Sequence, residues 1–106
     1  DSINLSSPLF YNNNYIDELV YPNPSSGVVK ISFQLPQAKK LSLNIYNNFG
    51  QIVKSLIDNE YLKEGAYTFL WDAKNNSGQD LPNGLYLLRA NTDNELLFNN
   101  KITLQK

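Results

Sequence analysis

The sequence predicts an all-β protein, an immunoglobulin-like antiparallel β-sandwich of about seven strands. Short runs of alternating apolar and polar residues recur along the chain, and turn-forming residues separate them at a spacing of roughly 8–12 residues. No segment repeats its apolar residues with the period of about 3.6 that marks an amphipathic helix. The chain contains no cysteine, which excludes the inter-sheet disulfide of antibody domains.

The predicted sandwich begins at the segment Tyr21-Pro22-Asn23-Pro24. Each proline fixes its own φ and disfavours the helical region for the residue before it, so no helix starts here. The Ser-Ser-Gly turn at 25–27 predicts a strand over 28–35. Its alternate apolar side chains are expected on one face: Val29, Ile31, Phe33 and Leu35. Residues 1–18 lack such a period and are expected to form a linker or a remnant of an upstream domain, whereas 19–106 form the sandwich.

Two further strands are predicted on either side of a turn at residues 48–50. Leu41, Leu43 and Ile45 alternate with polar residues, which predicts the first strand. Residues 51–57 predict its partner. The run Asp58-Asn59-Glu60 is expected to end that partner, because Asp and Asn favour turns.

The remaining strands carry the predicted centre of the core. Tyr67, Phe69 and Trp71 share one phase, and we expect Trp71 to lie between the sheets with Phe33. A turn is predicted at 75–78, and strands over 85–91 and 96–104. The apolar residues of the last strand share one phase: Leu96, Phe98, Ile102 and Leu104. Asn100 interrupts this phase, which predicts a β-bulge at that position.

The composition excludes several classes of function. The 106 residues contain no histidine and no cysteine, so the commonest general base, the Ser-His and Cys-His pairs and most zinc ligands are lacking. We therefore predict no enzymatic activity and no catalytic, metal or cofactor site. The net charge of −1 predicts no binding to nucleic acid, and the apolar runs are too short to insert into a membrane. We expect a monomeric domain and, since methionine is lacking, a C-terminal piece of a longer protein.

Two further patterns favour a structural role over a binding role. The aromatic residues at 67, 69 and 71 could stack on a sugar, but alternate aromatic residues of a sandwich strand usually fill the core. An oxygen-rich group offers candidate calcium ligands: Asp72, Asn75, Asn76 and Asp80. Lys74 occupies a ligand position of the EF-hand pattern and no glutamate closes the loop, so we expect no calcium site.

Several segments follow one another in an order that resembles a known family. They are Tyr21-Pro22-Asn23-Pro24, Tyr46-Asn47-Asn48-Phe49-Gly50-Gln51, Trp71-Asp72, Asn76 with Gly78, Gly84-Leu85-Tyr86, and Lys101 with Lys106. Over about residues 19–106 this order resembles the C-terminal sorting domains of type IX (Por) secretion substrates of Bacteroidetes. The family's Tyr-Asp-x-x-Gly-Arg turn is changed here, with Asn47 and Gln51 at the Asp and Arg positions. Asn47 can cap the backbone as Asp does, so we expect the turn to form.

The resemblance implies a secretion signal that directs a cargo protein through the type IX machinery, for release or cell-surface anchoring. The implied partners are that machinery, a sortase and an upstream cargo domain, and the implied location is the periplasm in transit, then the medium or outer surface. The residues assigned to signal recognition are Tyr21, Pro22, Asn23, Pro24, Gly50, Gly84, Tyr86, Lys101 and Lys106. We also expect the final strand to offer its backbone to a receptor by strand addition.

Two alternatives remain open. The Trp-Asp…Gly…Gly-x-Tyr stretch is also similar to the immunoglobulin-like domain of flagellar hook-capping proteins, which is a rival for the fold, although the Lys101 to Lys106 ending favours the sorting domain. The chain could instead be a non-catalytic accessory or carbohydrate-binding sandwich attached to a secreted enzyme. That role would require exposed aromatic residues on one face of a sheet.

Overall fold

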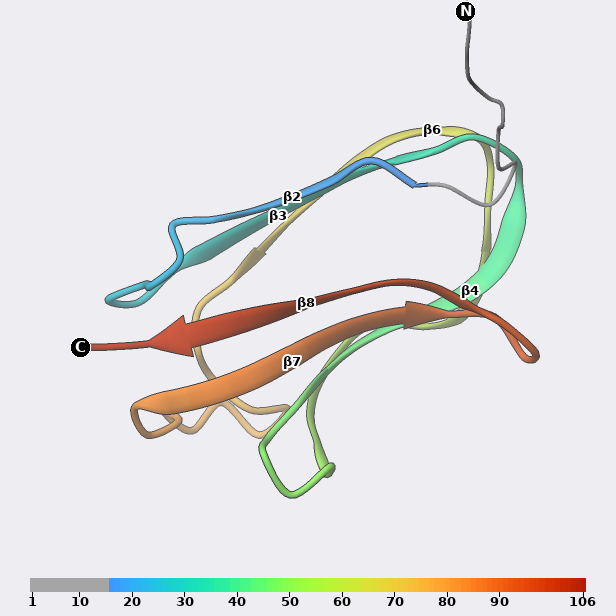
Figure 1. Ribbon diagram of the computed structural model, residues 1–106. Coiled ribbons are helices and arrows are strands. Elements are labelled where there is room, and N and C mark those ends of the chain that lie inside the picture. Colours follow the sequence, from blue (N-terminus) through green and yellow to red (C-terminus); the bar gives the residue numbers. More distant parts are fainter. Residues whose placement is uncertain (1–15) are drawn as a thin grey trace, which may run out of the picture.

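The computed structural model describes residues 16–106, which form seven antiparallel strands in two sheets packed face to face (Figure 1). The strands are β2 (Glu18–Tyr21), β3 (Val29–Leu35), β4 (Lys39–Tyr46), β5 (Ile52–Leu62), β6 (Gly65–Trp71), β7 (Gly84–Asn91) and β8 (Leu96–Leu104). The predicted all-β, immunoglobulin-like sandwich is confirmed. Within the described residues no helix is long and apolar enough to cross a membrane. The linker assigned to 1–18 lies almost entirely outside the described residues and stays a prediction.

Each sheet has a simple strand order. One sheet has three strands in the order β2-β3-β6, and the other has four in the order β5-β4-β7-β8. The chain crosses between the sheets after β3, after β5 and again after β6. The pairing of β3 with β6 sets Val29 opposite Trp71 and Phe33 opposite Tyr67, so the apolar phases predicted for both strands face the same core.

The core is centred on the two aromatic residues predicted to fill it. Trp71 is 1% exposed and Phe33 is 4% exposed. The Trp71 ring meets the Tyr86 ring edge-on at 5.8 Å, while Phe33 contacts Tyr67 at 5.5 Å and Phe98 at 5.6 Å between ring centroids. Trp71 Nε1 donates a hydrogen bond to the Lys74 carbonyl at 2.9 Å, which satisfies the polar atom of the buried indole.

Strand β5 is longer than predicted. The expectation that Asp58-Asn59-Glu60 ends the strand is wrong, because Glu60 still pairs with Leu41 of β4. Asn59 has a positive φ of 51°, its N–H is bonded to Ser42 Oγ at 2.9 Å, and the register shifts between Leu41 and Leu43. Turn-forming residues therefore bend this strand through a bulge without ending it.

The irregularity of β8 also lies elsewhere than predicted. Asn100 pairs regularly with Leu88 of β7, so the bulge expected at Asn100 is wrong. The register shifts instead near Leu97, where Phe98 pairs with Ala90 and Leu96 with Asn91. Leu97 is the additional residue and is buried, which leaves Leu96 49% exposed. Three consecutive apolar residues conceal the break in phase.

Two turns of the sandwich are built in the same way. In Asn47-Asn48-Phe49-Gly50-Gln51, Asn47 Oδ1 accepts from the backbone N–H groups of Phe49 and Gln51, and Asn47 Nδ2 donates to Gln51 Oε1. Residues 75–79, Asn-Asn-Ser-Gly-Gln, repeat these bonds with Asn75 in the place of Asn47. The glycine of each turn has φ of 82°, a conformation that strongly favours glycine. The first turn forms as predicted, with an Asn–Gln pair.

Candidate functional site

The side chain of Asn23 holds the last strand. Its Nδ2 donates to the carbonyl of Lys101 at 2.6 Å, and its Oδ1 accepts from the N–H of Thr103 at 2.9 Å. One amide thus satisfies a donor and an acceptor on the outer edge of β8, as a neighbouring strand would. The peptide bonds before Pro22 and Pro24 are both cis.

Ser25 continues this contact through its backbone. Its N–H donates to the Thr103 carbonyl and its carbonyl accepts from the Gln105 N–H, both at 2.8 Å. The Ser25 side chain is 1% exposed, and its Oγ donates to the Val28 carbonyl and accepts from the Gly27 N–H. We call residues 21–25 with their contacts on β8 the clasp. Figure 1 shows this loop and the C-terminus at the same end of the molecule.

The clasp changes one prediction about the last strand. We expected β8 to offer free backbone groups to a receptor near the chain end. From Lys101 to Gln105, however, its outer edge is already bonded to Asn23 and Ser25. Strand addition at these residues would first have to displace the clasp.

The final lysine is also fixed in place. The Lys106 N–H donates to Asn83 Oδ1 at 3.0 Å, and Lys106 Nζ donates to the Leu81 carbonyl at 2.8 Å. Nearby, Lys74 Nζ lies 2.8 Å from Asp80 Oδ1. This hydrogen bond, with the charges of Lys74 and Lys106, lowers the pKa of Asp80 below its ordinary value.

Three of the assigned recognition residues have a structural explanation. Gly50 occupies the positive-φ position of its turn, and Gly84 begins β7 with φ of 150°. Tyr86 is buried against Trp71, and its hydroxyl donates to the Pro82 carbonyl at 2.7 Å. Burial raises the pKa of this hydroxyl. These residues shape the end of the sandwich that also carries the clasp.

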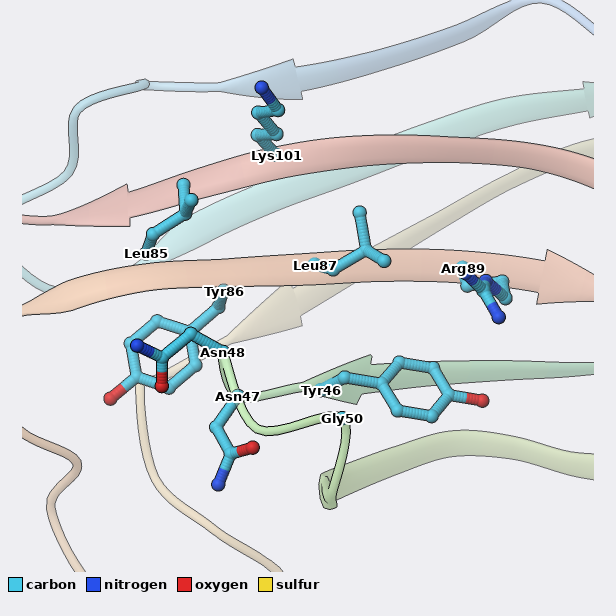
Figure 2. Close-up of a pocket in the computed structure, with 9 residues that line it drawn as sticks. All are labelled: Tyr46, Asn47, Asn48, Gly50, Leu85, Tyr86, Leu87, Arg89 and Lys101. Carbon is cyan, nitrogen blue, oxygen red and sulfur yellow. The ribbon is translucent and has the colours of Figure 1, made fainter.

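A pocket of about 400 Å³ lies beside the clasp, on the outer face of the four-stranded sheet (Figure 2). Strand β7 contributes Leu85, Leu87 and Arg89, and β8 contributes Lys101. Tyr46 and the following turn form the other wall, and the Arg89 guanidinium lies 5.4 Å from the centre of the Tyr46 ring. The pocket therefore combines apolar side chains with two cations.

The structure brings the assigned residues together at one end, although they serve different purposes. Asn23 touches β8, Lys101 and Gly50 line the pocket, and Lys106 secures the loop before β7. Tyr21 is half exposed with Lys30 Nζ 5.7 Å from its ring centre. Sequence reasoning missed Arg89. Its signal was the chain's one arginine in phase with Leu85 and Leu87 on an otherwise apolar strand.

The oxygen-rich residues near the second turn do not form a cluster of metal ligands. Asn75 Oδ1 accepts two backbone N–H groups, and Asp80 pairs with Lys74. Asp72 Oδ1 accepts the Lys74 N–H. Within residues 16–106, no three acidic side chains gather where a metal ion could bind.

The fold and the clasp define an immunoglobulin-like domain in which the loop after β2 is hydrogen-bonded to the outer edge of β8. The chain belongs to the FlgD Ig-like domain family, whose model matches residues 17–95. This is the family that the sequence had raised as the rival for the fold. No curated protein sequence matches the chain.

Two crystal structures share the fold. Dimeric latent PorU from Porphyromonas gingivalis is similar with a TM-score of 0.64 and 19% identity, over 96% of this chain and 10% of PorU. FlgD from P. aeruginosa is similar with a TM-score of 0.52 and 23% identity, over 80% of this chain and 71% of that protein. The chain therefore spans about a tenth of the length of PorU.

Proposed function

We propose that this domain is a C-terminal sorting signal of the type IX secretion system. In this role it folds in the periplasm, is recognised by the secretion machinery, and takes an upstream cargo protein to the medium or the outer cell surface. A sortase then removes it or exchanges it for an anchor. The domain itself performs no chemistry.

The clasp is the observation that carries this proposal. The Tyr-Pro-Asn-Pro segment and the C-terminal strand are the two ends of the sequence pattern that resembles sorting domains. In the folded protein Asn23 bonds directly to Lys101 and Thr103, although about 80 residues separate them. A receptor could therefore read both segments as one surface that exists only after folding.

The structural similarity supports the same reading. PorU is a type IX secretion protein, and the similarity to it covers 96% of this chain. The match to the FlgD Ig-like family ends at residue 95, before β8 begins at Leu96. The part of the chain beyond that match is the strand that the clasp secures.

A secretion assay tests the proposal. The 106 residues are fused to a foreign periplasmic protein in a Bacteroidetes host, and the exported fraction is measured. We expect export with the unaltered domain and a loss of export with Lys101→Glu, because this change reverses a charge next to the clasp. Lys101 forms no ion pair within the described residues, so the variant should retain the melting temperature.

Lys40→Glu is the matched control. Lys40 is an exposed lysine near the start of β4, whereas Lys101 lines the pocket at the other end of that strand, with Tyr46. It should export normally. If the unaltered domain fails to export cargo, the sorting role is refuted. If Lys101→Glu exports normally, the lysine takes no part in recognition.

The accessory carbohydrate-binding role gains no specific support. The aromatic side chains of β6 face the core, and the exposed aromatic residues lie on separate elements. Tyr21 ends β2, Phe49 lies in the first turn, and Tyr61 lies near the far end of β5. A glycan panel should therefore give no micromolar binding, and such binding would favour the accessory role.

A further inference from the structure

Strand β7 forms the floor of a groove on the outer face of the four-stranded sheet. Its outward side chains are Leu85, Leu87, Arg89 and Asn91. The pocket beside the clasp covers the first part of this row, and a second hollow of about 490 Å³ covers the part from Arg89 to the turn after Asn91. Both hollows are lined by Tyr46 and Arg89, so they adjoin at the contact between these two side chains. From Leu85 to Asn91 the strand rises roughly 20 Å, enough for six or seven residues of extended peptide.

Two polar atoms in this groove are buried without a partner. They are Arg89 Nε, a donor, and Asn91 Oδ1, an acceptor. Burying an unpaired polar atom costs about 1–3 kcal/mol, so such atoms require an explanation. A peptide group carries one acceptor and one donor, which is the complement of this pair.

The cationic and acidic side chains of the groove lie at different places along its length. Lys101 lies diagonally across from Arg89 on the neighbouring strand, and neither forms an ion pair within residues 16–106. The guanidinium of Arg89 is held against Tyr46, which orients it without neutralising it. Asp93 lines the opposite end of the groove, together with Glu95, whose carboxylate is paired with Lys39 at 3.5 Å. An anionic group is therefore favoured near Lys101 and disfavoured near the turn.

We propose that this groove, lined by Tyr46, Leu85, Leu87, Arg89, Asn91 and Lys101, binds an extended peptide segment of a partner protein that carries a carboxylate beside an apolar side chain. The carboxylate binds at the side of the pocket lined by Arg89 and Lys101, and the apolar side chain lies on Leu85 and Leu87. The peptide backbone pairs with Arg89 Nε and Asn91 Oδ1 once these two side chains have shifted, because both atoms are buried in the free chain. This site does not depend on the sorting role, since its chemistry would recognise such a segment in any partner.

A titration followed by nuclear magnetic resonance tests the groove. The isotope-labelled 106-residue chain is titrated with a pool of capped octapeptides that alternate Leu, Val and Thr with one Glu. The matched pool has Lys at the Glu position. We expect saturable shifts at the amides of Tyr46, Leu87 and Lys101 with the acidic pool alone.

Variants assign the binding to the groove. Arg89→Gln should weaken binding about tenfold or more, because it removes a charge-assisted hydrogen bond, and Lys101→Gln should weaken it less. Lys40→Gln should bind as the unaltered chain does. Equal shifts with both pools, no shifts at millimolar peptide, or unchanged binding by Arg89→Gln and Lys101→Gln together would overturn the proposal. Stronger binding to vesicles of phosphatidylcholine and phosphatidylglycerol than to the acidic pool, with shifts at the same amides, would also overturn it. The groove would then bind an anionic membrane surface and not a peptide.

Discussion

The two sheets differ in how their edges are protected. Loop residues cover the edges of the four-stranded sheet, whereas the β6 edge of the three-stranded sheet has no such cover within residues 16–106. Asn23 and Ser25 cover one edge of the four-stranded sheet at β8, and Asn76 covers part of its other edge at β5. Asn76 donates its N–H to the Val53 carbonyl at 3.0 Å and accepts the Ser55 N–H at Oδ1 at 3.1 Å. Beyond these residues β5 is bulged and charged, features that discourage further pairing.

Strand β6 is the contrasting edge. It pairs with β3 on one side only, and no loop within residues 16–106 bonds to its other side. From Gly65 to Trp71 it contains no charge and no proline, and Leu70 is 67% exposed. A single asparagine from a loop can therefore replace a missing strand, whereas an edge without such a residue remains open to pairing.

The largest effect on stability is expected at Trp71, which anchors the end of β6 although one side of this strand is unpaired within residues 16–106. Trp71→Ala removes the residue that fixes the end of β6 to Tyr86 in the other sheet. We expect a loss of about 3–5 kcal/mol in the free energy of unfolding. Denaturant unfolding measures this loss, and stability like that of the unaltered protein would contradict the assignment of Trp71 to the core.

The next largest effect on stability is expected when the asparagine side chains that protect the two edges of the four-stranded sheet are removed. Asn23→Ala removes two hydrogen bonds from β8 and should cost about 1–2 kcal/mol, whereas Asn76→Ala removes one side-chain bond from β5 and should cost about half as much. Asn48→Ala is the matched control. Asn48 stands in the first turn where Asn76 stands in the second, and no side-chain hydrogen bond is found for it. An equal loss in all three variants would mean that the edges do not depend on these amides.

A substitution at the unpaired edge of β6 should change stability less but should change solubility measurably. Leu70→Glu places a carboxylate opposite Lys30 on the outer face and should raise the concentration at which the protein self-associates. Static light scattering over a concentration series measures this. Leu19→Glu removes a similar exposed side chain from β2. If it has the same effect, general hydrophobicity is responsible and the β6 edge is not.

The smallest effect concerns pH at the second turn, near the residue that protects β5. The pKa of Asp80 in the folded protein lies below its ordinary value of 3.8, so its contribution to stability is full above pH 3.8 and is lost as pH falls through the folded-state pKa. The stability difference between the unaltered protein and Asp80→Asn should be largest at about pH 6 and vanish at about pH 2. In a Lys74→Gln background the difference should shrink at every pH at which Asp80 is ionised. A difference that persists at low pH would exclude the ion pair as its cause.

The sequence predicted the inward-facing residues well where alternation is unbroken. The apolar phases of β3, β4 and β6 face the core as expected, because a half-buried strand must alternate. The run Leu96-Leu97-Phe98 concealed the bulge of β8, and Asn59 lies in a bulge of β5 that its sequence made look like the end of the strand. The repeated Asn-Asn-x-Gly-Gln turn was visible in the sequence and overlooked.

The candidate site was predictable only in part. Residues 21–24 and Lys101 of the clasp were predicted as recognition residues, whereas Ser25 and Thr103 were not. The contact of Asn23 joins positions 78 and 80 residues apart through one amide, which local patterns do not encode. Arg89 was missed because its role depends on Tyr46 and Lys101, which lie on the two strands beside β7.

The clasp can form only late, because it joins an early segment of the chain to its last strand. A ribosome makes Asn23 long before Lys101 and Thr103, so the early segment stays without its partners until the last strand has been synthesised. Closing so long a loop is entropically slow, which places the contact late in folding. In a chain truncated before β8, the exposed Asn23 amide would bond to water in place of Lys101 and Thr103, and nothing would hold the loop against the last strand. The state of this one asparagine therefore reports whether the folded domain contains its last strand.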